Sequence, residues 1–372
     1  MKTQRLVTTL LLALSCSSAF AHHGFGRFDR ANDAYLTGTI TDIDFVNPHA
    51  YLYFDQVTAS GEVIAMRCEM RAATLMRRSG WTKEMFATGL PVSIYGFMHR
   101  EDPGSCYVEE ISVDDAPTLN RNDQLDTPAV DVSQREYLLP SGVPDLNGDW
   151  AQEQYVIGRP PSGELIGLVP KSMKPGIDAG TIDPGDVPDA GWGSRPVTFT
   201  ARGQAEADAF RGNVVADNPR LRCQPTSILF DWVFDGPVNR ITQTDERIVI
   251  DYGLYSFQRV IQLNLDAHPD NIEPSYAGHS IGHWEGNTLV VDTIGFEPGL
   301  LATPVKHSDQ LHIVERFTLD PETFQLTRAY VAEDPVYFTD QYIGQDVVIL
   351  ASVPYEKHEC DELTFEFLEF QD

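Results

Sequence analysis

The alternation of apolar and polar residues predicts short strands along most of the chain. Leu52 and Phe54 alternate with Tyr51 and Tyr53, as expected of a strand with one face in a core. In the first third of the chain we expect three strands, a short helix and two further strands, at 36–45, 50–57, 63–70, 72–78 (the helix), 92–97 and 107–113. This is the element order of a small OB-like five-stranded barrel, in which the third and fifth strands are neighbours.

A second run of strands follows residue 240, with candidates at 247–252, 255–263, 279–285, 288–294, 311–319, 324–332, 346–353 and 363–370. Short connections favour a larger antiparallel, lipocalin-like barrel, because closure removes exposed strand edges. Gly148-Asp149-Trp150 is similar to the Gly-x-Trp of the first strand in such barrels, so we expect this domain at 146–372. The predicted fold class is all-β.

A proline-rich stretch separates the two barrels. Residues 114–225 contain 13 of the 24 prolines, and proline interrupts helices and central strands. We therefore expect a linker at 116–145, after a first barrel at 22–115. The one clear helix of this stretch is expected at 200–211, with Thr200 as its N-cap.

The first 21 residues are typical of a signal peptide. Lys2 and Arg5 precede an apolar stretch at 6–14, and Ala19-Phe20-Ala21 has the small-x-small form of a cleavage site. We expect a periplasmic or secreted chain that begins at His22, or, as the alternative, a lipid anchor on Cys16. No later segment has the roughly 20 apolar residues of a membrane-spanning helix, so no membrane insertion is expected.

Four cysteines follow the leader, and an even number in an oxidising compartment favours disulfides. We predict the pairs Cys68–Cys106 and Cys223–Cys360, because each pair then stays inside one domain. The expected neighbouring strands of the small barrel also bring Cys68 near Cys106.

The charge limits the possible partners. The 372 residues contain 27 Lys and Arg against 55 Asp and Glu, a formal net charge of −28 at pH 7. Such a field repels phosphate backbones and anionic lipids, so we expect no nucleic-acid partner. A small-molecule ligand is expected, and the charge names no protein partner.

The expected mature N-terminus is a candidate metal site. A terminal His22 offers its α-amine and its imidazole Nδ1 together, and His23 or His49 can supply a third nitrogen, a set that suits copper. The alternative is that both terminal histidines belong to a solvated, frayed end.

Residues 279–294 predict a hairpin with Gly286-Asn287 as its loop. This register places His279, His283 and Glu285 on one face with Asp292. Glu315 interrupts an apolar strand face, and a buried carboxyl group can serve as a general acid or base. The alternative is an ion pair with Arg259 or Arg328. The catalytic candidates are therefore Glu315, His279, His283, His312 and Asp292.

Ser280 lies in a Gly-x-Ser-x-Gly sequence, with Asp292, Asp309 and His312 behind it. A nucleophilic serine in this motif requires a strand-to-helix turn. The predicted hairpin leaves no place for that helix, so a serine hydrolase is disfavoured.

Several motifs resemble a family of exported bacterial domains of unknown function: Ala21-His22-His23-Gly24-Phe25, Leu36-Thr37-Gly38-Thr39-Ile40, Val46-Asn47-Pro48-His49-Ala50 and Arg77-Arg78-Ser79-Gly80-Trp81-Thr82. The resemblance covers roughly 20–115 and implies an exported small β-barrel without an assigned activity. Residues 220–362 are similar to the second half of longer proteins of that group, at 222–225, 278–282, 284–293 and 307–309. This chain has His283 where those proteins usually have Arg.

Together, these features favour an exported protein that binds a small, partly apolar ligand in the C-terminal barrel, with copper at its N-terminus. The first alternative is an enzyme, an isomerase, lyase or hydrolase, that uses Glu315 and the nearby histidines. The second is a structural module of the cell envelope. Aromatic residues such as Trp232 and Trp284 line a cavity in the first two cases and fill the core in the third.

The copper hypothesis predicts that affinity depends on the free α-amine of His22. Calorimetric titration with copper should show tight binding by the processed protein and much weaker binding by a form with one additional N-terminal residue. Equal affinity of the two forms would contradict the chelate.

Overall fold

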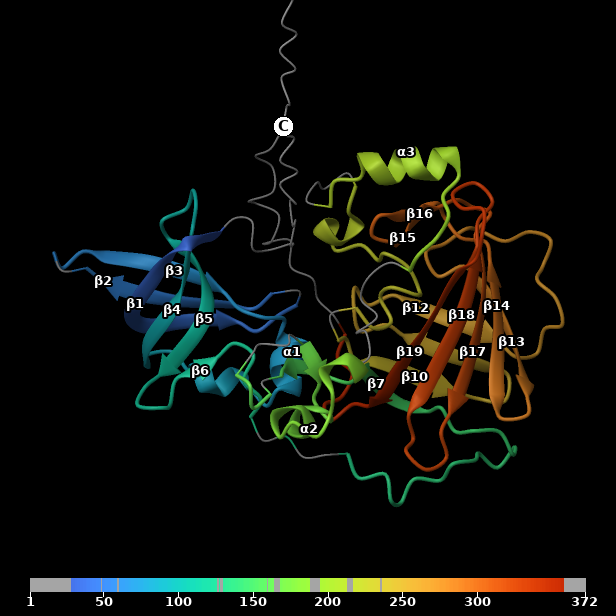
Figure 1. Cartoon of the computed structure of the whole chain (residues 1–372), viewed down its shortest axis with the longest axis horizontal. Coiled ribbons are helices and arrows are strands. Elements are labelled where there is room, and N and C mark those ends of the chain that lie inside the picture. The colour runs from blue at the N-terminus through green and yellow to red at the C-terminus, as the bar shows by residue number, and fades with distance from the viewer. Residues whose placement is uncertain are drawn as a thin grey trace, which may run out of the picture.

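The computed structural model describes residues 28–357, except 48, 59, 126, 128–129, 159, 164–167, 188–194, 213–216 and 235. Two β units lie side by side (Figure 1). Helices are short, namely α1 (Ala73–Arg78), α2 (Lys174–Asp178) and α3 (Ala201–Ala209), with 3-10 turns at Lys83–Phe86, Pro184–Asp186 and Pro219–Arg222. The all-β prediction is confirmed.

The N-terminal unit contains β1 (Phe28–Asp44), β2 (Tyr51–Val57), β3 (Val63–Glu69), β4 (Pro91–His99), β5 (Ser105–Val113) and β6 (Leu119–Asn120). They pair in the order β3-β2-β1-β4-β5-β6, and a parallel β3–β5 pairing joins the ends of the first five into a ring. Helix α1 lies between β3 and β4, as predicted. Leu52 and Phe54 are buried within the ring, in keeping with the alternation of the sequence.

A disulfide closes this ring between Cys68 on β3 and Cys106 on β5, as predicted. The two cysteines are direct partners in the β3–β5 register, with their Cα atoms 4.4 Å apart. Cys223 is also disulfide-bonded. Its predicted partner, Cys360, lies outside the described residues, so that pairing stays a prediction.

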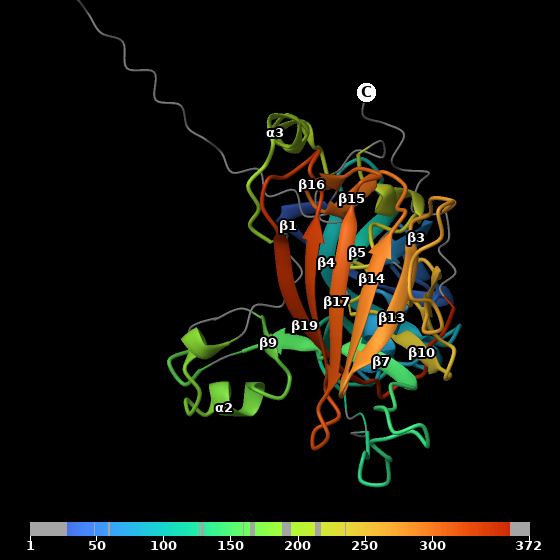
Figure 2. The ribbon, with the colours of Figure 1, turned by 90° about the vertical axis from the view of Figure 1, so that its right-hand side faces the viewer.

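The larger unit is a closed barrel of nine strands, β7 (Gly148–Gln152), β10 (Asn239–Gln243), β11 (Arg247–Asp251), β12 (Gln258–Gln262), β13 (His279–Glu285), β14 (Thr288–Ile294), β17 (His312–Leu319), β18 (Leu326–Glu333) and β19 (Tyr342–Leu350). Figure 2 shows β13, β14, β17 and β19 along its wall. Strand β7 contains the predicted Gly-Asp-Trp start and closes the barrel between β10 and β19.

One neighbouring pair of the barrel, β12–β13, is parallel. A parallel pair needs a crossover instead of a tight turn, and the long loop at 263–278 provides it. Strand β19 begins four residues before the predicted start at 346, because its register with β18 extends from Val348 opposite Leu326 back to Tyr342 opposite Ala332. The strand expected at 363–370 lies outside the described residues.

The proline-rich stretch contains little regular structure. Within it, strands β8 (Tyr155–Ile157) and β9 (Leu168–Pro170) form a small hairpin near α2 (Figure 2). A second small hairpin, of β15 (Gly299–Ala302) and β16 (Val305–His307), lies outside this stretch, near α3 (Figures 1 and 2). The sequence did not indicate these hairpins, because strands of three or four residues carry too few alternating positions. Thr200 is the N-cap of α3, as predicted, and its Oγ1 accepts from the backbone N–H of Gly203 at 3.0 Å.

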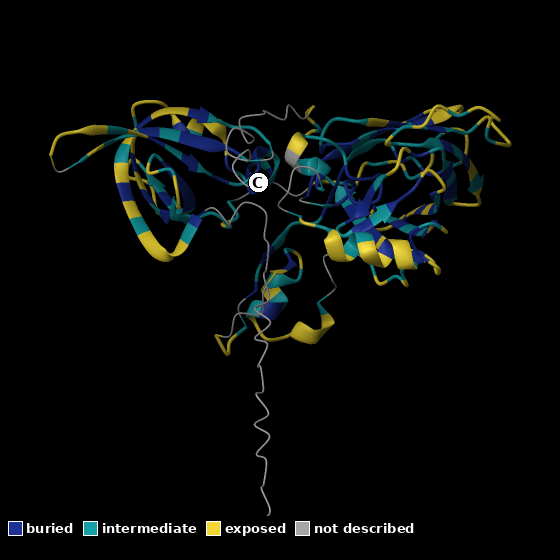
Figure 3. Ribbon diagram, turned by 90° about the horizontal axis from the view of Figure 1, so that it is seen from above, coloured by how far each residue is buried: buried dark blue, intermediate teal, exposed yellow. Residues whose placement is uncertain are grey.

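The chain at 226–233 packs into the barrel and is buried along its whole length. The Trp232 ring contacts Tyr252 and Phe317 with centroid distances of 6.0 and 6.2 Å. Ile228 and Trp232 are members of the same buried cluster as Trp150. Figure 3 shows the buried residues of both β units in dark blue.

Arg78 at the end of α1 joins the two units. Its side chain is buried, and it donates to the carbonyl oxygen of Gly236 at 2.8 Å and to that of Gln152. Burial, together with the cation of Arg71, lowers the pKa of Arg78 to about 10. Next to it, Ser79 Oγ accepts from Gln154 Nε2 at 3.0 Å.

Arg78→Met should destabilise the protein by about 2 to 4 kcal/mol, because two buried carbonyl groups lose their donor. Chemical denaturation measures this change, and limited proteolysis should cut the 116–145 segment faster. Arg100→Met, at a half-exposed side chain of the same unit, is the control and should change stability by less than about 0.5 kcal/mol. Equal effects of the two substitutions would contradict the bridging role of Arg78.

Candidate functional site

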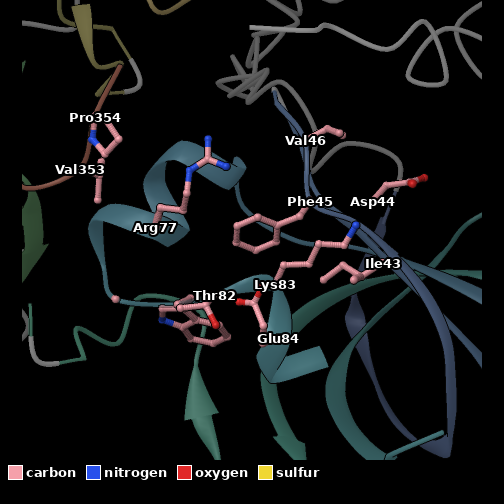
Figure 4. Close-up of a pocket in the computed structure, with 12 residues that line it drawn as sticks. Ile43, Asp44, Phe45, Val46, Arg77, Thr82, Lys83, Glu84, Val353 and Pro354 are labelled. Carbon is pink, nitrogen blue, oxygen red and sulfur yellow. The ribbon is translucent and has the colours of Figure 1, made fainter. Parts of the chain in front are cut away.

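A pocket of about 500 Å³ lies between the N-terminal unit and the chain that follows β19 (Figure 4). Its walls come from the end of β1, from α1 and the turn after it, and from the segment beyond β19. The lining residues are Ile43, Asp44, Phe45, Val46, Arg77, Gly80, Trp81, Thr82, Lys83, Glu84, Val353 and Pro354. Residues more than 250 positions apart therefore share one cavity.

Asn47 holds two of these walls together. Its Oδ1 accepts from the backbone N–H of Thr74 at 3.0 Å, and its Nδ2 donates to Thr74 Oγ1 at 2.9 Å. The chain after β1 is thereby attached to the first turn of α1. The Val46–Ala50 and Arg77–Thr82 motifs, which are separate in the sequence, consequently meet at the pocket.

The pocket combines an aromatic surface with charged groups. The guanidinium of Arg77 lies 5.8 Å from the centre of the Phe45 ring and forms an ion pair with Glu356 at 2.8 Å. Asp44 accepts a hydrogen bond from Tyr53 OH at 2.8 Å. Backbone and Thr82 hydrogen bonds hold the pKa of Glu84 below its usual value. Apolar surface with a few polar groups is the usual composition of a small-molecule site.

Glu315 lies inside the barrel and is fully buried between two arginines. It accepts from Arg259 Nη2, and from Arg328 Nη1 at 3.3 Å. Arg328 also pairs with Asp346 at 2.6 Å. These contacts are those of the structural alternative, in which Glu315 is an ion-pair partner of Arg259 and Arg328.

The same network holds the buried chain at 226–233, which we call the inserted segment. Arg328 donates to the carbonyl oxygens of Ile228 and Leu229, at 2.9 and 2.8 Å. Tyr252 OH donates to the Ile228 carbonyl at 3.1 Å, and burial raises the pKa of Tyr252 to about 12. Burial also raises the pKa of Asp231, in the same segment, to about 7.

A second polar cluster lies on the outer wall of the barrel, where three of the predicted catalytic residues meet. His312 Nε2 is 2.9 Å from Asp292 Oδ2, and His268 Nε2 is 2.9 Å from Asp292 Oδ1. His268 Nδ1 in turn lies 2.8 Å from His279 Nδ1. The predicted hairpin register, with Ile281 opposite Asp292, brings His279 and Asp292 to this face.

His268 was not among the sequence candidates. It lies in the irregular loop between β12 and β13, where no periodicity indicates which way a side chain points. Burial and the neighbouring His268 lower the pKa of His279 below its ordinary value of 6.5. Burial alone would raise the pKa of Asp292, but hydrogen bonds from His312 and His268 outweigh it and lower that pKa.

The remaining candidates lie elsewhere. His283 is exposed on the strand and contacts Glu285 at 3.3 Å, while Glu285 also pairs with Arg316 at 2.6 Å. Ser280 is buried inside β13, where its Oγ accepts from Arg259 Nε at 2.9 Å. The strand-to-helix turn of a nucleophilic serine is therefore missing at this position.

His49 Nδ1 lies 2.9 Å from Glu69 Oε1, and His22 and His23 lie outside the described residues. Within the described ranges, no group of three or more His, Cys, Asp or Glu side chains is arranged to hold a metal ion. The terminal copper site stays a prediction.

The comparisons with known proteins cover only the N-terminal unit. Residues 10–106 match a family of unknown function (DUF6152). This range includes β1 to β4, both motifs of the pocket and the disulfide between Cys68 and Cys106; we call it the DUF6152 domain. No curated protein and no solved structure matches the chain. Across the part that the structure describes, no helix has the length and apolar character needed to cross a membrane.

Glu315→Gln should lower the free energy of unfolding by about 3 to 5 kcal/mol, because it leaves two buried arginines without their shared carboxylate. Urea denaturation followed by tryptophan fluorescence measures the loss. Glu322→Gln, in an exposed turn, is the matched control and should stay within about 0.5 kcal/mol of the parent. A parent-like stability of Glu315→Gln would contradict the structural role of the network.

The lowered pKa of His279 predicts a loss of stability in mild acid. The unfolded chain binds the proton more readily, so this contribution is present above pH 6.5 and disappears as the pH falls through the pKa of the folded state. Between about pH 7 and pH 5, His279→Gln should therefore lose less stability than the parent. An equal loss of stability in His279→Gln and in the parent would contradict this prediction.

Proposed function

We propose that the protein binds a small, partly apolar molecule in the pocket between the DUF6152 domain and the segment after β19. The observation that carries this proposal is the cavity of about 500 Å³ lined by Phe45, Trp81 and Val353 together with the cations Arg77 and Lys83. A volume of this size suits a ligand of drug-like dimensions, and the polar groups are few enough to orient it.

The barrel interior was the ligand site that the sequence favoured. It contains the large side chains of Trp150, Trp232 and Phe317, which are all buried, and the ion pairs of Glu315. The inserted segment at 226–233 adds its own backbone and side chains to this space. These contacts support the junction pocket, instead of the barrel interior, as the binding site.

Export is part of the proposal. The basic and apolar pattern of the first 21 residues supports a signal peptide, and the Cys68–Cys106 disulfide supports an oxidising compartment. The ring order β1-β2-β3-β5-β4 supports an OB-like assignment for the first unit. The second unit is similar to a lipocalin in being a closed barrel, and this closure is the feature that supports a lipocalin-like assignment.

Acid–base chemistry at the outer wall of the barrel is the second candidate function. The specific observation is the chain of contacts from Asp292 through His268 to His279, at 2.9 and 2.8 Å. A hydrogen bond between two ring nitrogens holds one proton, so His279 and His268 share it and can pass it on. In this alternative His279 is the general base, with Asp292 orienting His268.

Filling the pocket should abolish ligand binding. The probe is the neutral dye N-phenylnaphthylamine, whose fluorescence rises in an apolar environment. Val353→Trp, on the pocket wall, should reduce its binding at least about tenfold, because the indole occupies the space of the ligand. Ser352→Trp is the control, since Ser352 is exposed and does not line the pocket. Equal titration curves for the two variants would contradict the proposed site.

A further inference from the structure

The pocket contains a cation, Arg77, whose counterion is the exposed side chain of Glu356. We propose that the pocket selects molecules with one anionic group, a carboxylate or a sulfonate, which replaces Glu356 on Arg77. This inference rests on the proposed binding function and specifies the class of ligand.

Arg77 is held in the position that an anionic ligand needs. Its side chain is 26% exposed, and its guanidinium faces the Phe45 ring at 5.8 Å. A guanidinium presents parallel N–H donors that match the two oxygens of a carboxylate, and it stacks on aromatic rings at the same time. A ligand with an aromatic or aliphatic body can thus contact Phe45 while its anionic group binds Arg77.

Glu356 is an easily displaced partner of Arg77. Its side chain is 53% exposed, and ion pairs between solvent-exposed groups contribute little to stability. The backbone next to it is anchored independently, because Tyr355 N–H donates to Asp149 Oδ2 at 3.0 Å. The Tyr355 ring also lies under the guanidinium of Arg240, 5.2 Å from it. Rotation of the Glu356 side chain therefore frees Arg77 without moving the pocket wall.

The other charged groups around the pocket are two acids and a second cation. The two acids that line it, Asp44 and Glu84, have hydrogen-bond donors of their own in Tyr53 and Thr82. Lys83 forms no hydrogen bond or ion pair with another residue of the described ranges, and its side chain lies along the Phe45 side of the cavity in Figure 4. An anionic ligand therefore meets one exchangeable cation and a second cation nearby.

A matched pair of dyes tests this proposal. Anilinonaphthalene sulfonate differs from N-phenylnaphthylamine by one sulfonate group, so the ratio of their affinities measures the preference for the anion. We define binding in the pocket as the fluorescence increase that the parent protein shows and that is absent in Val353→Trp. We expect the parent protein to bind the sulfonate more tightly than the neutral dye.

Glu356→Gln should raise the affinity for the sulfonate about twofold to fivefold, because the competing carboxylate is removed. Arg77→Met should weaken sulfonate binding about tenfold or more. Glu356→Gln should leave the affinity for the neutral dye within about twofold of the parent, since the apolar walls remain, and Arg77→Met should lower the ratio of sulfonate affinity to neutral-dye affinity. Glu62→Gln, an exposed acid of the β2–β3 hairpin, is the charge-matched control and should change neither dye.

Pocket binding of both dyes with equal affinity, unchanged by Glu356→Gln, would overturn the anion preference and leave the binding function standing. Failure of both dyes to bind in the pocket would overturn the binding function and this inference together. Should Arg77→Met prove unfolded by circular dichroism, the response of Glu356→Gln alone decides between these results.

Discussion

The ion-pair network inside the larger barrel is the constraint on which the rest of that unit depends. Glu315 lies between Arg259 and Arg328, and Arg328 also binds Asp346 and two carbonyl groups of the inserted segment. A single buried charge is strongly unfavourable, so each member requires the others. The network consequently joins β12, β17, β18 and β19 from the inside and holds the segment at 226–233 in place.

A filled barrel changes where the molecule can bind a ligand. Its interior is a packed core, and the described cavity lies instead where the DUF6152 domain meets the chain that leaves the barrel. Arg78 connects the two units through buried hydrogen bonds, and its neighbour Arg77 faces the cavity. Two consecutive arginines at the end of α1 thus have different tasks, because adjacent helical positions point in different directions.

Local patterns predicted much of the fold and part of the candidate sites. The alternation of apolar residues located most strands, and the predicted barrel order placed Cys68 beside Cys106. The hairpin at 279–294 placed His279 and Asp292 on one face. Glu315 was identified as unusual from its apolar surroundings, but which arginines it meets depends on strand neighbours. His268 and the pocket were missed, because an irregular loop and distant segments carry no periodic signal.

The sequence by itself determined the all-β class and the face on which residues of the predicted strands lie, because these follow from a period of two residues along the chain. It also favoured the Cys68–Cys106 pairing, because the predicted element order makes the third and fifth strands neighbours. The tertiary structure alone decided that the inserted segment fills the barrel, that Glu315 is neutralised by two arginines and that Val353 and Phe45 line one pocket. These contacts join residues that are far apart in the chain, and their energies depend on packing and burial, which exist only after the strands have closed into barrels.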